Sequence, residues 1–106
     1  MVIRWFDGKL PTSTSLMSRV DDAIARATRA LGDRVREVDV LVRDDNGPRG
    51  GVDKLCRLVA KVSGARPIVV ESRGTDYHST SLAAVRKLKH ALTHRANLAH
   101  THHPHP

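Results

Sequence analysis

The residue types with the clearest chemistry are basic side chains near the end of the chain, which could bind phosphate groups. Apolar residues recur there three or four positions apart, at Leu82, Val85, Leu88 and Leu92. This spacing predicts an amphipathic helix whose apolar face is buried. Guanidinium, ammonium and protonated imidazole groups all pair with phosphate oxygens, so the opposite face is predicted to bind a polyanion. Its candidate residues are Arg86, Lys87, Lys89, His90 and Arg95.

The positive charge is unevenly distributed along the sequence. Lys and Arg number 18 against 11 Asp and Glu, which gives a net charge of +7. Residues 1–53 hold as many acids as bases, and no acid follows Asp76. A basic, acid-free segment favours a nucleic acid partner, because each neutralised phosphate releases counterions. The alternative is a charged surface that only keeps the protein soluble.

No residue pattern of an enzyme site is found. The sequence lacks paired carboxylates, a Walker phosphate-binding loop and a nucleophile constellation. The lone Cys56 alternates in phase with Leu58 and Ala60, which predicts a buried small residue rather than a nucleophile. We therefore expect no catalytic residue, no cofactor and no small-molecule substrate.

Histidines concentrate in the last residues, 99–106. Imidazole binds zinc, nickel and copper, so a metal-binding or metal-responsive protein is the alternative function. The histidine spacing matches no ordered zinc motif, and Pro104 interrupts it. We predict a His/Pro-rich disordered tail over 99–106 without a specific metal site. The histidines concerned are His100, His102, His103 and His105.

A first helix is predicted to carry further basic residues. Thr12 or Ser13 is a plausible N-cap, and Gly32 is placed to end the helix. The apolar stripe that predicts the helix consists of Met17, Val20, Ile24, Ala27 and Leu31. The basic residues that fall off this stripe, and would face outward, are Arg19, Arg26 and Arg29.

The remaining segments have the period of two that is typical of strands. Polar and apolar residues alternate over 38–43 and 55–62, and short apolar runs at 2–6 and 67–71 predict two more strands. The predicted order is β-α-β-β-β-α, an α+β domain with two helices packed on one face of a four-stranded sheet. The first strand should run parallel to its neighbour, and the later ones antiparallel.

The most specific segment, DDNGPRGGVDKLCR at residues 44–57, lies between two predicted strands. Asn46-Gly47 and Gly50-Gly51 permit sharp reversals, so a hairpin connection explains the glycines. A turn does not require Arg49 or Lys54, which add positive charge at the end of the sheet.

This segment resembles the ribosome hibernation promoting factor family, also called sigma-54 modulation or ribosome-associated inhibitor proteins. Many bacterial members carry Asp-x-Asn-Gly-Pro-Arg/Lys-Gly-Gly-x-Asp-Lys-x-Cys between their second and third strands. The resemblance extends in order over residues 1–98, a single domain, as a short-form member. Asp76 and Tyr77 adjoin, where the family usually has one residue between them. The matching residues are Asp44, Asn46, Gly47, Pro48, Arg49, Gly50, Gly51, Asp53, Lys54 and Cys56.

The resemblance implies a fold like a double-stranded-RNA-binding domain and a place in the decoding channel of the small ribosomal subunit. There the chain would contact ribosomal RNA through basic helix faces and block mRNA and tRNA. Lys87 matches a recurrent family lysine, and His90 occupies a position that is more often Arg or Lys. Arg86, Lys89 and Arg95 continue that surface, to which the three arginines of the first helix could contribute.

Other expectations concern compartment and assembly. No apolar run approaches the ~20 residues of a membrane span, and one cysteine fits a reducing compartment, so we expect a cytoplasmic protein that contacts no membrane. We expect it to be monomeric off the ribosome. A protein–protein regulator, as the sigma-54 name suggests, is a third hypothesis. Whether the protein pairs ribosomes or idles single ones stays open.

Overall fold

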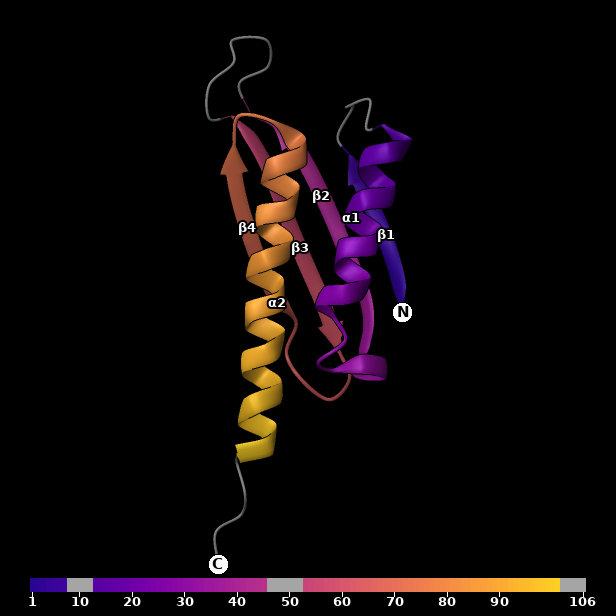
Figure 1. Cartoon of the computed structure of the whole chain (residues 1–106), viewed down its shortest axis with the longest axis vertical. Helices are drawn as coiled ribbons and strands as arrows, with labels where there is room; N and C mark the ends of the chain where they lie inside the picture. Colours follow the sequence, from indigo (N-terminus) through magenta and orange to yellow (C-terminus); the bar gives the residue numbers. More distant parts are fainter. Residues whose placement is uncertain (8–12, 46–52, 102–106) are drawn as a thin grey trace, which may run out of the picture.

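The computed structural model describes residues 1–7, 13–45 and 53–101. Figure 1 shows the elements in chain order, and they follow the predicted β-α-β-β-β-α sequence. A 3₁₀ turn at Gly32–Arg34 separates the first helix from the second strand. The bounds are β1 Val2–Asp7, α1 Thr14–Ala27, β2 Val35–Asp44, β3 Lys54–Val62, β4 Ile68–Gly74 and α2 Tyr77–Thr101.

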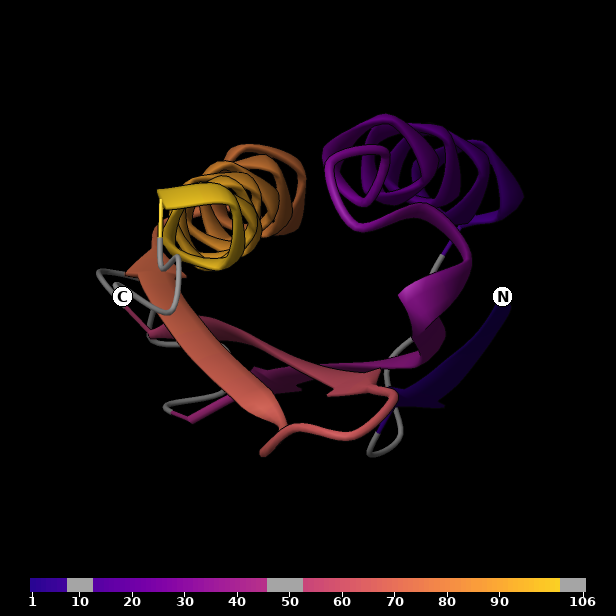
Figure 2. The ribbon, with the colours of Figure 1, turned by 90° about the horizontal axis from the view of Figure 1, so that it is seen from below.

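The four strands form one sheet in the order β1-β2-β3-β4. β1 pairs parallel with β2, and β2, β3 and β4 pair antiparallel, as predicted. Both helices lie side by side on one face of the sheet, and no helix formed by the described residues covers the other face (Figure 2). The molecule therefore has two distinct surfaces. The helical face is the outward side of α1 and α2, and the open sheet face is the side of the sheet that points away from them.

The core lies between the helices and the sheet. α1 buries Val20, Ile24 and Ala27 of its predicted stripe. α2 contributes the buried residues Val85, Leu88 and Leu92, as its period of three and four predicted. The sheet supplies the alternate residues Val38, Val40, Val42, Cys56, Leu58, Ala60 and Val62.

The opening strand packs beneath α1 through an aromatic residue. Trp5 pairs in register with the buried Val40, so it faces the helices and packs against the core. Its indole Nε1 donates a hydrogen bond to Asp21 Oδ1 of α1 at 2.8 Å. A half-buried Trp N–H needs a partner, and this bond fixes α1 relative to the edge strand.

α1 ends four residues earlier than its apolar stripe suggested. Ser13 is its N-cap and accepts a hydrogen bond from the Leu16 amide at 3.1 Å. At the other end the Thr28 hydroxyl donates to the Ala25 carbonyl, and the Gly32 amide donates to the Thr28 carbonyl. Gly32 has φ +54°, so the chain reverses there, and Leu31 is buried from the turn rather than from the helix.

α2 begins directly after Asp76, which caps it. The Asp76 carboxylate accepts hydrogen bonds from the Ser79 amide at 2.8 Å and from the Ser79 hydroxyl at 2.6 Å. These bonds, together with the nearby His78, hold the pKa of Asp76 below its ordinary value of 3.8. A carboxylate at this end also complements the helix dipole.

Replacing Asp76 by Ser keeps a capping oxygen but removes the charge, and we expect the stability difference from the wild type to depend on pH. Because the pKa of Asp76 is lowered on folding, its charge stabilises the fold above its unfolded pKa, and that contribution is lost as the pH falls through the folded pKa. Thermal unfolding of both proteins from about pH 6 to about pH 2.5 measures this. The two melting temperatures should converge at low pH, and a constant gap would show that charge plays no part.

α2 continues to Thr101, three residues past the predicted boundary at residue 98. Its 25 residues give a length of about 37 Å. Residues 102–106 lie outside the described residues, so the division into a domain and a tail stays a prediction.

Candidate nucleic-acid interface

The exposed side of the two helices carries the predicted cations together. Arg19 and Arg26 are exposed on α1, Arg29 follows in the turn after it, and Arg86 and Lys89 are exposed on α2. Within the described part of the chain, none of these five forms an ion pair with a carboxylate. Their charge is therefore available to an external anion.

A groove between the helices is lined by two of these cations, Arg19 and Arg26. One stretch of it is lined by Arg19, Asp22 and Arg26 of α1, and by His78 and Leu82 of α2. A wider pocket adjoins it at the helix N-termini and shares two of these residues, Arg19 and His78. The outward surface of α2 continues the basic character, where a shallow hollow is lined by Arg86, Lys89, His90 and Thr93.

Two predicted contact residues of α2 lie toward β4 instead. The Lys87 ammonium donates to the Glu71 carbonyl at 2.6 Å, and the Arg95 guanidinium donates to the Arg66 carbonyl at 2.8 Å. These neutral acceptors hold α2 against the edge of the sheet and leave both positive charges unneutralised. Lys87 remains exposed, so it can still meet a phosphate at the border of the helical face.

Lys54 occupies a different environment from the one predicted. Its ammonium lies 2.9 Å from Asp44 Oδ2 and 3.1 Å from Asp53 Oδ1, and 5.4 Å above the Tyr77 ring. The hydrogen bond to Asp44 is the main cause that raises the pKa of Lys54 above 10.5. Lys54 thus neutralises internal carboxylates at the base of the residue 44–57 segment, and we assign it to the fold rather than to the interface. Arg49 lies outside the described residues.

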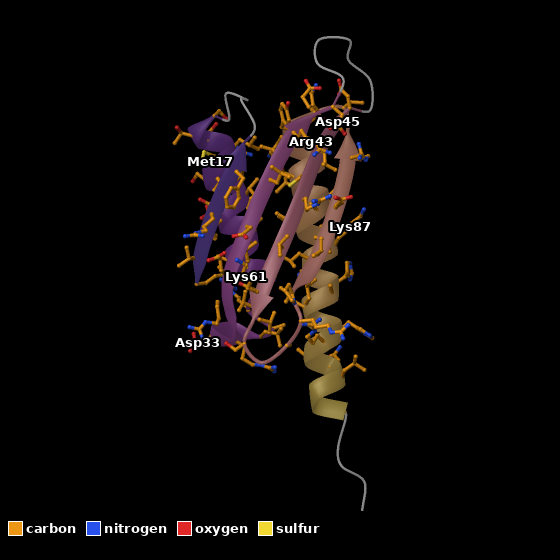
Figure 3. The ribbon with its side chains drawn as sticks, turned by 180° about the vertical axis from the view of Figure 1, so that it is seen from behind. Met17, Asp33, Arg43, Asp45, Lys61 and Lys87 are labelled. Carbon is orange, nitrogen blue, oxygen red and sulfur yellow. The ribbon has the colours of Figure 1, made fainter. Side chains whose placement is uncertain are left out.

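The open face of the sheet has charges of both signs that pair with one another (Figure 3). Glu37 and Asp39 on β2 both contact Lys61 on β3, at 2.8 and 3.5 Å. The further pairs on this face are Arg4–Glu37, Arg57–Glu71, Arg43–Asp45 and Arg73–Asp45. This face therefore presents little net charge, whereas Arg19, Arg26, Arg29, Arg86 and Lys89 on the helical side form no ion pair with a described acid.

Two residues considered for chemistry belong to the core. Cys56 is fully buried, and burial raises the pKa of its thiol to about 11, so it is not a thiolate nucleophile at neutral pH. Tyr77 is half-buried against the core with its hydroxyl enclosed. The burial of Cys56 confirms the prediction of a buried small residue, and Tyr77 packs against the core as well.

Metal-ligand chemistry has no support in the described residues. No group of three or more His, Cys, Asp or Glu side chains among them is arranged to hold a metal ion. His102, His103 and His105 lie outside the described residues, so the tail hypothesis stays a prediction. Over the part of the chain that is described, no helix is long and apolar enough to cross a membrane.

The fold defines the class of this protein, an α+β domain of the kind found in ribosomal interface proteins. A ribosomal subunit interface protein from Coxiella burnetii superposes with a TM-score of 0.79 and 15% identity, over 92% of this chain and 99% of that one. The N-terminal domain of Protein Y from Thermus thermophilus gives a TM-score of 0.67 and 16% identity, over 89% and 93%. No family model and no curated protein sequence matches.

These likenesses confirm the expected resemblance at the level of the fold. The Coxiella protein is described as a ribosomal subunit interface protein. At 15–16% identity the likeness carries over the fold and no residue role. The site must therefore be argued from the side chains of this chain.

Proposed function

We propose that this chain is a ribosome-associated translation inhibitor, or hibernation factor, that binds ribosomal RNA of the small subunit through its helical face. The observation that carries the proposal is the row of unpaired cations on α1 and α2, opposite a sheet face whose charges neutralise one another. The fold shared with a ribosomal subunit interface protein supports the ribosome as the polyanion.

The mechanism is occlusion. A-form RNA is recognised mainly by shape and by phosphate contacts, which suits a rigid helical face with separate cations. In the decoding channel the domain would occupy space that mRNA and tRNA need. No cofactor and no catalytic step is part of the proposal, and the protein works in the cytoplasm as a monomer. The contacting residues are Arg19, Arg26, Arg29, Arg86, Lys89 and His90, with Lys87 and Arg95 at the β4 border.

Co-sedimentation with purified small subunits, large subunits and whole ribosomes across a salt series tests the proposal. We expect saturable binding to small subunits that tRNA and mRNA displace. If about five phosphates are contacted, log affinity should fall against log salt with a slope of roughly −4. Equal binding to both subunits, or no binding at low salt, would contradict the proposal.

A further inference from the structure

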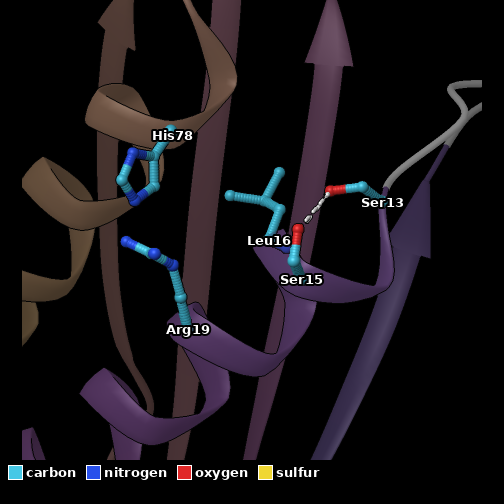
Figure 4. A pocket seen from close by; sticks show the side chains of 5 residues that line it. All are labelled: Ser13, Ser15, Leu16, Arg19 and His78. Carbon is cyan, nitrogen blue, oxygen red and sulfur yellow. Dashed lines mark hydrogen bonds between the residues drawn. The ribbon is translucent and has the colours of Figure 1, made fainter.

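The pocket at the N-termini of the two helices has the chemistry of a phosphate site. Its volume is about 450 Å³, within the roughly 300–1,000 Å³ of ligand sites in general. Among the described residues it is lined by Ser13, Ser15, Leu16 and Arg19 of the α1 region and by His78 of α2. Figure 4 shows the His78 ring and the Arg19 guanidinium pointing toward each other from the two helices.

Among the described residues of its lining, the two basic side chains share this pocket without a carboxylate. Arg19 forms no ion pair with a described acid. Asp76 lies near His78, but it does not line the pocket, and its carboxylate accepts hydrogen bonds from Ser79. Asp22 lines the adjoining stretch of the groove, not the pocket itself. An anion placed between these two basic groups can contact both of them.

The serine hydroxyls add a neutral donor on the α1 side. Ser13 Oγ accepts from the Leu16 amide and shares a 3.4 Å hydrogen bond with Ser15 Oγ, in which one hydroxyl donates to the other. The proton of the accepting hydroxyl is left to donate to a ligand. The first turn of α1 contains no acidic residue, so no charge of its own neutralises the positive end of the helix dipole. Guanidinium, imidazole and a hydroxyl together match the several acceptor oxygens of a phosphate group.

We propose that this pocket binds one phosphate group, held between Arg19 and His78 with the Ser13 or Ser15 hydroxyl as a further donor. The pocket adjoins the interhelical groove of the proposed RNA interface and shares Arg19 and His78 with it. Binding of an RNA phosphate in the pocket therefore rests on the proposed function. The phosphate comes either from the backbone of a bound RNA or from a free or terminal phosphate. An internal phosphodiester and a phosphomonoester offer the same oxygens to these donors.

Titration of the ¹⁵N-labelled full chain with inorganic phosphate, followed by NMR, tests the pocket without any ribosome. We expect saturable shifts at Ser15, Arg19 and His78 with a dissociation constant on the order of millimolar, which is the range of a single small anion. Chloride at the same ionic strength should leave these signals nearly unchanged. Arg19→Gln and His78→Gln should each weaken binding about tenfold, and Arg57→Gln on the open sheet face should not. The proposal is wrong if chloride causes the same shifts, or if phosphate still causes them in both the Arg19→Gln and the His78→Gln variants.

A second arm separates the two phosphate sources. A short oligoribonucleotide without a terminal phosphate should shift the same signals if a backbone phosphodiester enters the pocket. If only its 5′-phosphorylated form shifts them, the pocket takes a phosphomonoester. The titration with inorganic phosphate contains no RNA, so it tests the pocket separately from the proposed function. A protein that binds small subunits but not phosphate would contradict only the pocket, and one that binds phosphate but not ribosomes would contradict only the proposed function.

Discussion

Neutralising Arg86 and Lys89 together should weaken binding to the small subunit by about 100-fold near 0.1 M salt, because each lost phosphate contact removes roughly a factor of ten there. Both side chains are exposed on α2 and neither pairs with a described acid. The slope of log affinity against log salt should flatten from roughly −4 to roughly −2.5. Co-sedimentation of Arg86→Gln/Lys89→Gln across the salt series measures both quantities.

The matched control removes two charges from the opposite face. Arg4→Gln/Arg57→Gln changes the net charge by the same amount, but these arginines already pair with Glu37 and Glu71 on the open sheet face. We expect its affinity to stay within about threefold of the wild type, since long-range attraction is largely screened at this salt. If both double variants lose affinity equally, the net charge governs binding and the helical face is not the interface.

Replacing Lys54 by Met should lower the melting temperature by about 10 °C or more. Asp53 is fully buried, and the Lys54 ammonium at 3.1 Å is the cation beside its carboxylate. Methionine keeps the length of the side chain and its contact with Tyr77 but leaves a buried charge uncompensated. Removing one partner of a buried ion pair is strongly destabilising for that reason. Thermal unfolding followed by circular dichroism measures the loss.

Two further variants isolate the cause. Lys61→Met removes an ammonium that is half exposed and pairs with Glu37 and Asp39 at the surface, so its effect should be only a few degrees. Lys54→Met/Asp53→Asn should recover part of the loss, because the buried charge is then gone. If Lys54→Met melts like Lys61→Met, the internal role is wrong and Lys54 returns to the candidate RNA contacts.

The periodic elements followed from the sequence because their signals are local. The three-and-four spacing of Val85, Leu88 and Leu92 and the alternation around Val40 each report one buried face, and these residues are buried as predicted. Leu82, at the start of the same stripe, is only half-buried and lines the interhelical groove. Asp76 could be assigned as a cap for the same reason, since a cap acts within one helical turn. The end of α1 was misplaced because Leu31 is buried from a turn, and burial alone does not distinguish a turn from a helix.

The position of the unpaired positive charge on the surface could not be predicted from the sequence, because it depends on which residues meet across the sheet. By sequence, the whole excess of positive charge lies after residue 53. In the structure, Lys61 and Arg73 of that half are neutralised by Glu37, Asp39 and Asp45 of the first half. Arg19 and Arg26, from the balanced half, stand unpaired beside α2. The unpaired positive charge is therefore distributed unevenly between the two faces of the molecule, and this distribution does not follow the two halves of the sequence.

The sequence alone thus determined the order and type of the elements and the buried stripes, and its resemblance predicted the fold that this chain shares with the two solved structures. Strand register and helix packing decided which cations are left for a partner. Those contacts join residues far apart in the sequence, such as Arg4 and Glu37 or Arg73 and Asp45, beyond the reach of any local pattern. The same packing turned Lys54 inward to Asp53 and brought His78 opposite Arg19, so the candidate site exists only once the two helices lie together on the sheet.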